Sequence, residues 1–325
     1  MRTRGTVAVA LIALWALFLS PSRAQDSYPS RTITMIVPFP PGGSTDVIGR
    51  IVAEGLRRVL GQPVLLDNRA GASGMLGTAA IVKAAPDGYT IGMGTASTLA
   101  INQAVYKNQS YDVTVDLAAI GNIADVPNIM SVNPRVPAKN MAELIALAKR
   151  EPGKLSYATP GHGTVGHVIG EQFKLSTGTD ILHVPYRGMA AALNDAIGGQ
   201  VQVIYDNLPT SLELVKSGKL RAIALSAPKR VEALPDVPTF GELGLDEINW
   251  MGFFGLVAPK ATPPAIVKRL NEALKRVLAM PGVRDKLAAQ QAFVVGNSPD
   301  EFHAMIVREV ARMRRATAAA KIELN

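Results

Sequence analysis

Three glycine-rich turns carry the residues with the clearest potential to bind a ligand, and each lies between an expected strand and an expected helix. The sharpest is 38–46 (PFPPGGSTD); the others are 68–74 (NRAGASG) and 159–167 (TPGHGTVGH). Glycine lets backbone amides approach a ligand without a Cβ in the way, and a helix start adds unpaired N–H groups and a positive dipole end. One such turn alone could be a capped turn that binds nothing. Three turns that meet at one cleft predict an anion-binding site.

Catalytic groups are scarce in the sequence. It contains neither a G-x-S-x-G elbow nor a Walker loop, and the absence of cysteine excludes disulfides, thiol nucleophiles, Cys-ligated zinc and iron–sulfur clusters. His162, His167 and His183 suggest a zinc trio, but their spacing along the chain matches no common zinc motif. We therefore expect these histidines to line or flank a cleft, and we expect no catalytic residue, metal or cofactor.

The segment 1–24 has the pattern of a secretory signal. Arg2 and Arg4 precede the uncharged run 7–19, and Ser22-Arg23-Ala24 places small residues at the −3 and −1 positions. A membrane anchor is the alternative, but the apolar run is shorter than the roughly 20 residues that span a bilayer. We predict cleavage after Ala24 and a periplasmic mature protein.

Composition points to a globular protein with a small positive charge. At 48% hydrophobic and 18% charged residues, the chain of 325 residues is not disordered. Its net charge of +8 falls to +5 without the three arginines of the segment 1–24. The basic cluster Arg308, Arg312, Arg314 and Arg315 is interspersed with Glu309 and apolar residues, which favours a solvated helix face over a nucleic-acid site.

Apolar spacing predicts alternating strands and helices along the mature chain, which implies parallel sheets with right-handed crossovers. Expected strands are 31–39, 63–66, 89–93, 155–159, 181–185, 201–205, 220–226, 250–257 and 293–296. Expected helices are 45–60, 75–85, 140–150, 166–177, 189–198, 210–217, 263–279 and a long terminal helix opened by the capping box 298–301.

Two segments have the character of crossings between lobes. Residues 128–132 lead out of the first block, and 250–257 lead back after a stretch rich in proline and glycine. We therefore expect an α/β protein with lobe 1 formed by 25–127 and 252–325, and an inserted lobe 2 formed by 128–251. Each lobe is expected to be a mostly parallel sheet flanked by helices, with the ligand in the cleft at the carboxyl ends of strands.

The G-x-G-x-x-G from Gly161 to Gly166, with Asp180 downstream near the position of the acidic residue that the motif requires, also fits a dinucleotide fingerprint. The strand before it (LSYAT) is short and polar, and an exported protein is an improbable place for NAD. An exported α/β enzyme stays open as an alternative, although it would need a base and nucleophile or a metal set.

The same turns carry a family resemblance. The chain resembles the solute-binding receptors of tripartite tricarboxylate transporters (Bug-type periplasmic proteins) in motifs such as IVPFPPGGSTDVIGRIVAEGL, LSYATPGHGTVGH and HVPYRGMAAALNDAIGGQVQVIYDNLP. The matching stretches follow one another in order over nearly the whole mature chain: 36–56, 64–94, 126–149, 155–167, 183–209, 218–226 and 234–245.

The resemblance implies a two-lobed periplasmic-binding-protein (Venus flytrap) receptor that encloses a small carboxylate-bearing solute. In this family backbone amides, hydroxyls and bridging waters hold the carboxylate. The positions that correspond here are Phe39, Pro41, Gly42, Ser44 and Asp46 in the first lobe, and Thr159, Gly161, Gly163, Thr164, His167 and Asp206 in the second. Thr95 and Ser97 follow the third strand and would line the same cleft.

Because the sequence departs from the family pattern at three places, it does not determine the identity of the ligand. Ser73 stands where the family usually has glycine and joins the candidate ligand-binding residues, Met75 replaces a commonly polar residue, and His162 with Val165-Gly166 replaces small polar residues. The solute is thus a dicarboxylate, an aromatic acid, an amino acid or a neutral molecule. The resemblance also implies delivery to a membrane permease of one large and one small subunit; an orphan sensor with a signalling partner is the alternative. We expect a monomer that binds no nucleic acid.

Overall fold

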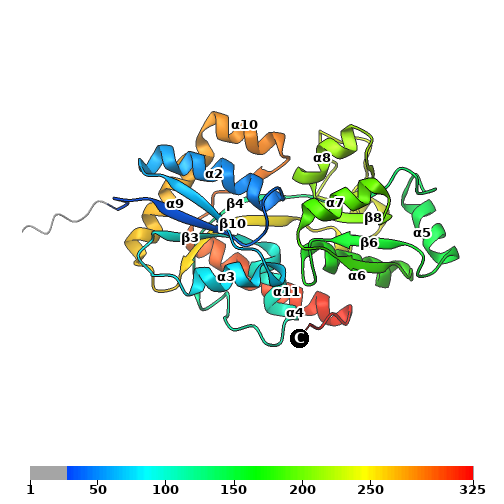
Figure 1. Cartoon of the computed structure of the whole chain (residues 1–325), viewed down its shortest axis with the longest axis horizontal. Coiled ribbons are helices and arrows are strands. Elements are labelled where there is room, and N and C mark those ends of the chain that lie inside the picture. Colours follow the sequence, from blue (N-terminus) through cyan, green and yellow to red (C-terminus); the bar gives the residue numbers. More distant parts are fainter. Residues whose placement is uncertain (1–27, 325) are drawn as a thin grey trace, which may run out of the picture.

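The computed structural model describes residues 28–324, which form two sheets flanked by helices and set side by side as two lobes (Figure 1). The predicted signal peptide, 1–24, lies outside the described residues. Within residues 28–324, no helix has both the length and the apolar character needed to cross a membrane.

The first sheet has six strands in the order β11-β4-β10-β3-β1-β2. Its strands are β1 (Ile33–Val37), β2 (Val64–Asn68), β3 (Thr90–Thr95), β4 (Leu117–Val126), β10 (Gly252–Pro259) and β11 (Phe293–Val294). The helices of this lobe are α2 (Ser44–Leu60), α3 (Met75–Val82), α4 (Asn102–Val105), α9 (Pro264–Ala279), α10 (Pro281–Ala289) and α11 (Pro299–Ala319), with short 3₁₀ and π turns at Ala72–Gly74 and Ser97–Ile101. The chain thus returns to this sheet after building the second one.

The second sheet has five strands in the order β7-β6-β8-β5-β9. Its strands are β5 (Asn128–Val132), β6 (Ser156–Thr159), β7 (Leu182–Pro185), β8 (Val203–Asn207) and β9 (Arg221–Ser226). Its helices are α5 (Met141–Arg150), α6 (Val165–Thr177), α7 (Met189–Gly198) and α8 (Leu208–Lys216), followed by 3₁₀ turns at Gly241–Leu243 and Asp246–Ile248. The α/β architecture in two lobes is as expected from the sequence.

Both sheets are mixed, which corrects the expectation of mostly parallel sheets. β1 pairs in parallel with β2 and β3, but β10 runs antiparallel to both β3 and β4. In the second sheet β5 runs antiparallel to β8 and β9, whereas β6 is parallel to β7 and β8. The reason is that each crossing strand enters its new sheet between two strands that run the other way.

Apolar stripes explain why the helices dock where they do. In α2 the side chains of Ile48, Val52 and Leu56 recur at helical spacing and are fully buried against the first sheet. Burial of each such side chain contributes about 1.5–3 kcal/mol. The helix ends at Gly61, whose φ of 71° is the left-handed conformation of a helix C-cap. The first turn of α2 is thereby fixed at the carboxyl end of β1.

The two crossings lie next to each other. The Asn128 side chain at the start of β5 donates from Nδ2 to the carbonyl oxygen of Trp250 at 2.9 Å. Its Oδ1 accepts from Asn207 Nδ2 at 2.6 Å. These bonds join both crossing segments to the end of β8, so a movement at the crossings is transmitted to the residues that follow β8.

Candidate functional site

Four helices begin at the space between the two lobes: α2, α6, α7 and α8. Their N-cap residues provide no side-chain hydrogen bond to the first turn, and they are Gly43, Thr164, Gly188 and Asn207. First-turn N–H groups have no acceptor within their own helix, and each helix start carries the positive end of the dipole. The cleft therefore collects several amide donors and several partial positive charges.

These helix starts surround a small pocket of about 50 Å³ between the lobes. Its walls come from the turn after β1, from the ends of β3 and β8, from the first turns of α6 and α7, and from β10. The lining residues are Phe39, Pro40, Gly43, Ser44, Thr45, Thr95, Ala96, Ser97, Asn128, Pro160, Thr164, Val165, Gly166, Met189, Tyr205, Asp206, Asn207, Gly252, Phe253 and Phe254. The walls of the pocket therefore offer hydroxyl groups and aromatic surface.

Hydrogen bonds across the cleft hold the lobes together. Ser44 Oγ donates to Asn207 Oδ1 at 3.1 Å, and the Val165 N–H donates to Ser97 Oγ at 3.2 Å. At the mouth of the cleft, Tyr106 OH donates to the His162 carbonyl oxygen at 3.2 Å. The chain is therefore in a closed conformation.

Asp206 is the buried acid of the pocket. Its carboxylate accepts hydrogen bonds from the hydroxyls of Thr210 at 2.6 Å and Ser211 at 2.7 Å and from the Asn207 N–H at 2.7 Å. Burial nevertheless raises the pKa of Asp206 to about 6, because these donors only partly replace water around the charge. Neither Lys nor Arg is among the lining residues, so the carboxylate has no cation to pair with.

The structure brings together six of the residues predicted for the site. They come from both lobes and all line the small pocket between the lobes: Phe39, Ser44, Thr95, Ser97, Thr164 and Asp206. Two more, Ser73 and Gly161, lie outside the pocket and line an adjoining groove.

Six other predicted residues line neither cavity: Pro41, Gly42, Asp46, Thr159, Gly163 and His167. Asp46 forms its hydrogen bonds within its own lobe. Its carboxylate accepts from Arg50 Nε at 2.9 Å, from Asn68 Nδ2 at 3.1 Å and from the Gly42 N–H at 3.2 Å. Although burial opposes it, these bonds hold the pKa of Asp46 below its usual value. Asp46 therefore shapes the turn that carries the pocket residues.

Several lining residues were not predicted. Asn128 and Asn207 line the pocket and bond to each other, and Phe253 and Phe254 cover it from β10. The sequence does hold a signal for them, because all four lie in or next to the crossing segments or the end of β8. Met189 belongs to a helix start that has no glycine-rich turn of its own.

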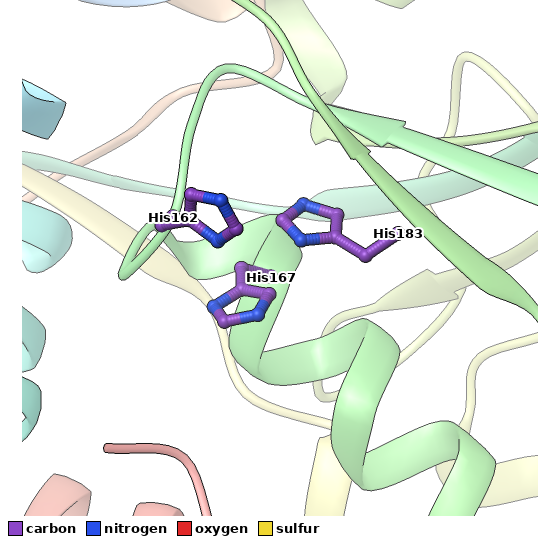
Figure 2. A group of neighbouring side chains, drawn as sticks. All are labelled: His162, His167 and His183. Carbon is purple, nitrogen blue, oxygen red and sulfur yellow. The ribbon is translucent and has the colours of Figure 1, made fainter. Parts of the chain in front are cut away.

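Three histidines meet behind the second-lobe turn, as Figure 2 shows. His162 comes from the turn, His167 from the first turn of α6 and His183 from β7. One ring nitrogen of each lies within 4.8 Å of the others, so the cluster has the potential to hold a metal ion. Burial lowers the pKa of His167 to about 4 and that of His183 to about 3.

The hydrogen bonds of the cluster favour a packing role. His167 Nδ1 accepts from the Gly163 N–H at 3.1 Å, so the neutral ring carries its proton on Nε2 and has no further lone pair. His183 Nε2 is bonded to Thr159 Oγ1 at 2.7 Å. The rings of His167 and His183 are inclined by only 22°, so their in-plane lone pairs do not converge on one ion. The histidines hold the turn in place from behind.

Comparison with known proteins places the chain in a family. The sequence profile of the "Tripartite tricarboxylate transporter family receptor" matches residues 48–321. Protein BugT of Bordetella pertussis is 39% identical over 311 residues, which are 95% of each chain. A Rhodopseudomonas palustris protein solved with adipate is 35% identical with a TM-score of 0.88, over 91% of this chain and 99% of the other. MatC from Rhodopseudomonas palustris, solved with malate, is 29% identical with a TM-score of 0.86, over 89% and 99%. This chain therefore belongs to the receptor family of the tripartite tricarboxylate transporters.

Proposed function

We propose that this chain captures a small carboxylate in the pocket between the lobes and delivers it to a tripartite tricarboxylate-type membrane transporter. The observation that carries the proposal is the set of three helix starts, those of α2, α6 and α7, whose N-cap residues leave first-turn amides free around a pocket shared by both lobes. The family consists of receptors, so the chain is a binding protein and not an enzyme.

The chemistry of the pocket supports a carboxylate. A carboxylate that leaves water needs hydrogen-bond donors in place of its hydration shell. The pocket supplies such donors from fixed amides at helix starts and from the hydroxyls of Ser44, Thr95, Ser97 and Thr164. Hydrogen bonds to a charged acceptor are stronger than those between neutral groups. Adipate and malate, in the two Rhodopseudomonas palustris structures, are both carboxylates. Phe39 is suited to cover the apolar part of the ligand.

Capture in this proposal is a hinge motion between lobe 1 (25–127 and 252–325) and lobe 2 (128–251). The closed form makes the bonds Ser44–Asn207 and Ser97–Val165, and a ligand that touches both lobes adds contacts that the open form lacks. Such differential contacts shift the population toward closure. In this proposal the pivot is the pair of Asn128, at the first crossing, and Asn207, at the end of β8.

In the cell we place the mature protein in the periplasm after cleavage behind Ala24, as a monomer that meets a permease of one large and one small subunit. This proposal rests on the signal pattern of the segment 1–24 and on the family to which the chain belongs.

A thermal-shift panel tests the proposal. We expect at least one mono- or dicarboxylate to raise the melting temperature, because a ligand that binds only the native state at 100 times its Kd stabilises it by about 2.7 kcal/mol. For a chain of this size that is a rise of several degrees. The matched controls are the primary amides of the same acids, which keep the shape and lose the charge. Stabilisation by the amides and by no acid would refute the carboxylate assignment.

A further inference from the structure

Two glycines in the second-lobe turn make room for side chains of the first lobe. Gly161 and Gly163 have positive φ values of 143° and 65°. A Cβ atom on Gly161 would lie 2.7 Å from Ser73 Oγ, and one on Gly163 would lie 2.8 Å from Tyr106 Cε2. Cβ atoms do not approach other heavy atoms so closely. Glycine is therefore needed at both positions for the approach of the first lobe, as well as for the backbone conformation of the turn.

The contact between Tyr106 and this turn lies apart from the ligand pocket. The Tyr106 ring lies against Gly163, and its hydroxyl donates to the carbonyl oxygen of His162 at 3.2 Å. Neither Tyr106 nor Gly163 is among the residues that line the pocket between the lobes. Tyr106 therefore joins the two lobes without being a wall of the pocket.

The C-terminal segment holds the backbone around Tyr106 in place (Figure 1). The Leu324 N–H donates to the Val105 carbonyl oxygen at 2.9 Å, and the Lys107 N–H donates to the Leu324 carbonyl oxygen at 3.2 Å. These two bonds form a parallel β-bridge between Leu324 and Tyr106. Ile322 is 7% exposed and anchors the segment in the core. Because the backbone on both sides of Tyr106 is fixed, its side chain is ready for contact with the second lobe.

We propose that Tyr106 is a latch for lobe closure, which Gly163 of the second lobe receives and the C-terminal segment 322–324 braces. This inference rests on the hinge motion of the proposed function and adds the residues that set how long the closed form lasts. Tyr106 is a positioning residue, since it acts on the ligand only through closure. The latch forms after the ligand has entered the open form, so it slows release and not capture. It stabilises the closed form equally for every acid in the pocket.

Rapid-mixing kinetics with two different acids test the latch. The probes are adipate and malate, the acids in the two Rhodopseudomonas palustris structures. We expect Tyr106→Ala to raise the dissociation rate constants of both acids by the same factor of about ten, because a hydrogen bond and an aromatic contact between the lobes are lost. The association rate constants should change by less than about twofold. Tyr106→Phe keeps the ring and should have a smaller effect. Unequal factors for the two acids would mean that Tyr106 contacts the ligand, which would refute the latch.

Gly163→Ala tests the position that receives the ring. Its methyl group would meet the Tyr106 ring and should weaken adipate binding about tenfold or more, but alanine at this positive φ also strains the backbone. Gly178→Ala is the matched control, since Gly178 has a φ of 62° and a Cβ atom there would have no neighbour within 4 Å in the described part of the chain. It should bind adipate like the wild type. In the Tyr106→Ala background, Gly163→Ala should lose most of its effect. An equal effect in both backgrounds would contradict the inference.

A distance measurement without ligand tests the latch separately from the ligand assignment. The chain contains no cysteine, so Ala70→Cys and Arg187→Cys place two spin labels at exposed positions on opposite lobes. We expect Tyr106→Ala to lower the population with short distances, and we expect deletion of residues 323–325 to lower it to a smaller extent. Glu323→Gln removes only the exposed ion pair with Lys107 and should change nothing.

The two proposals fail in different ways in this measurement. The same distance distribution in the wild type and in Tyr106→Ala would refute the latch, whichever acid binds. A shifted distribution in a protein that binds neither adipate nor malate would support the latch and count against the carboxylate assignment.

Discussion

Ser44→Phe is expected to abolish capture of the ligand. Ser44 lies in the first turn of α2, is 6% exposed and donates across the cleft to Asn207. A phenylalanine side chain does not fit a pocket of about 50 Å³ and would hold the lobes apart while it occupies the ligand's place. Because both the contacts and closure are lost, we expect a loss of affinity of at least about 100-fold, or about 2.8 kcal/mol.

The control for this prediction is Ser44→Ala. It removes one hydrogen bond between the lobes, worth about 1 kcal/mol, and should weaken binding only about fivefold. Both variants should melt close to the wild type without ligand, since the side chain points into the cleft and not into a lobe core. X-ray scattering should give a larger radius of gyration for Ser44→Phe than for the wild type with ligand. Wild-type affinity in Ser44→Phe would place the ligand outside this pocket.

Apolar periodicity predicted most of the elements, because each of them buries one clear face. The expected helix 45–60 is α2 (Ser44–Leu60), and the expected helix 189–198 is α7 with the same bounds. β4 was missed. Nearly all of its ten residues are buried, yet its sequence LAAIGNIADV is rich in alanine, glycine and asparagine and alternates in no regular way. The strand lies between β11 and β10, and its burial depends on the helices packed against the sheet, which the local sequence does not reveal.

The site was predictable at the level of turns but not of individual side chains. Ser44 and Asp46 are two residues apart on α2, and about 200° of helical rotation separates them. Ser44 faces the other lobe, whereas Asp46 turns back to Arg50 and Asn68. Which of the two faces meets the ligand depends on where the second lobe sits, and no local pattern contains that information. The pairing of Asn128 with Asn207, 79 positions apart, is hidden for the same reason.

The second large effect concerns pH. We expect the affinity for a carboxylate to fall as the pH rises from about 5 to about 8, because Asp206 and the ligand share one pocket. Burial raises the pKa of Asp206 to about 6 from 3.8, and a bound anion nearby, without a cation in the pocket walls, raises it further. Below pH 6 the acid is neutral and the ligand meets no opposing charge. Above pH 6, Asp206 either takes up a proton when the ligand binds or keeps its negative charge and repels the ligand.

The sign and size of this dependence follow from linkage. A group whose pKa is higher in the complex favours binding in its protonated form, so affinity falls by up to about tenfold per pH unit between the two pKa values and then levels off. Calorimetry with a carboxylate that stays ionised throughout, in buffers of different ionisation enthalpy, measures both the affinity and the protons taken up.

Asp206→Asn keeps the shape of the side chain and should remove the pH dependence, with tighter binding than the wild type at pH 8. Asp195→Asn, a change at a half-exposed acid of α7, should keep the wild-type profile. A flat profile in the wild type would mean that the ligand's negative charge lies away from Asp206, which would orient the acid with its carboxylate toward the amides of α2 and α6.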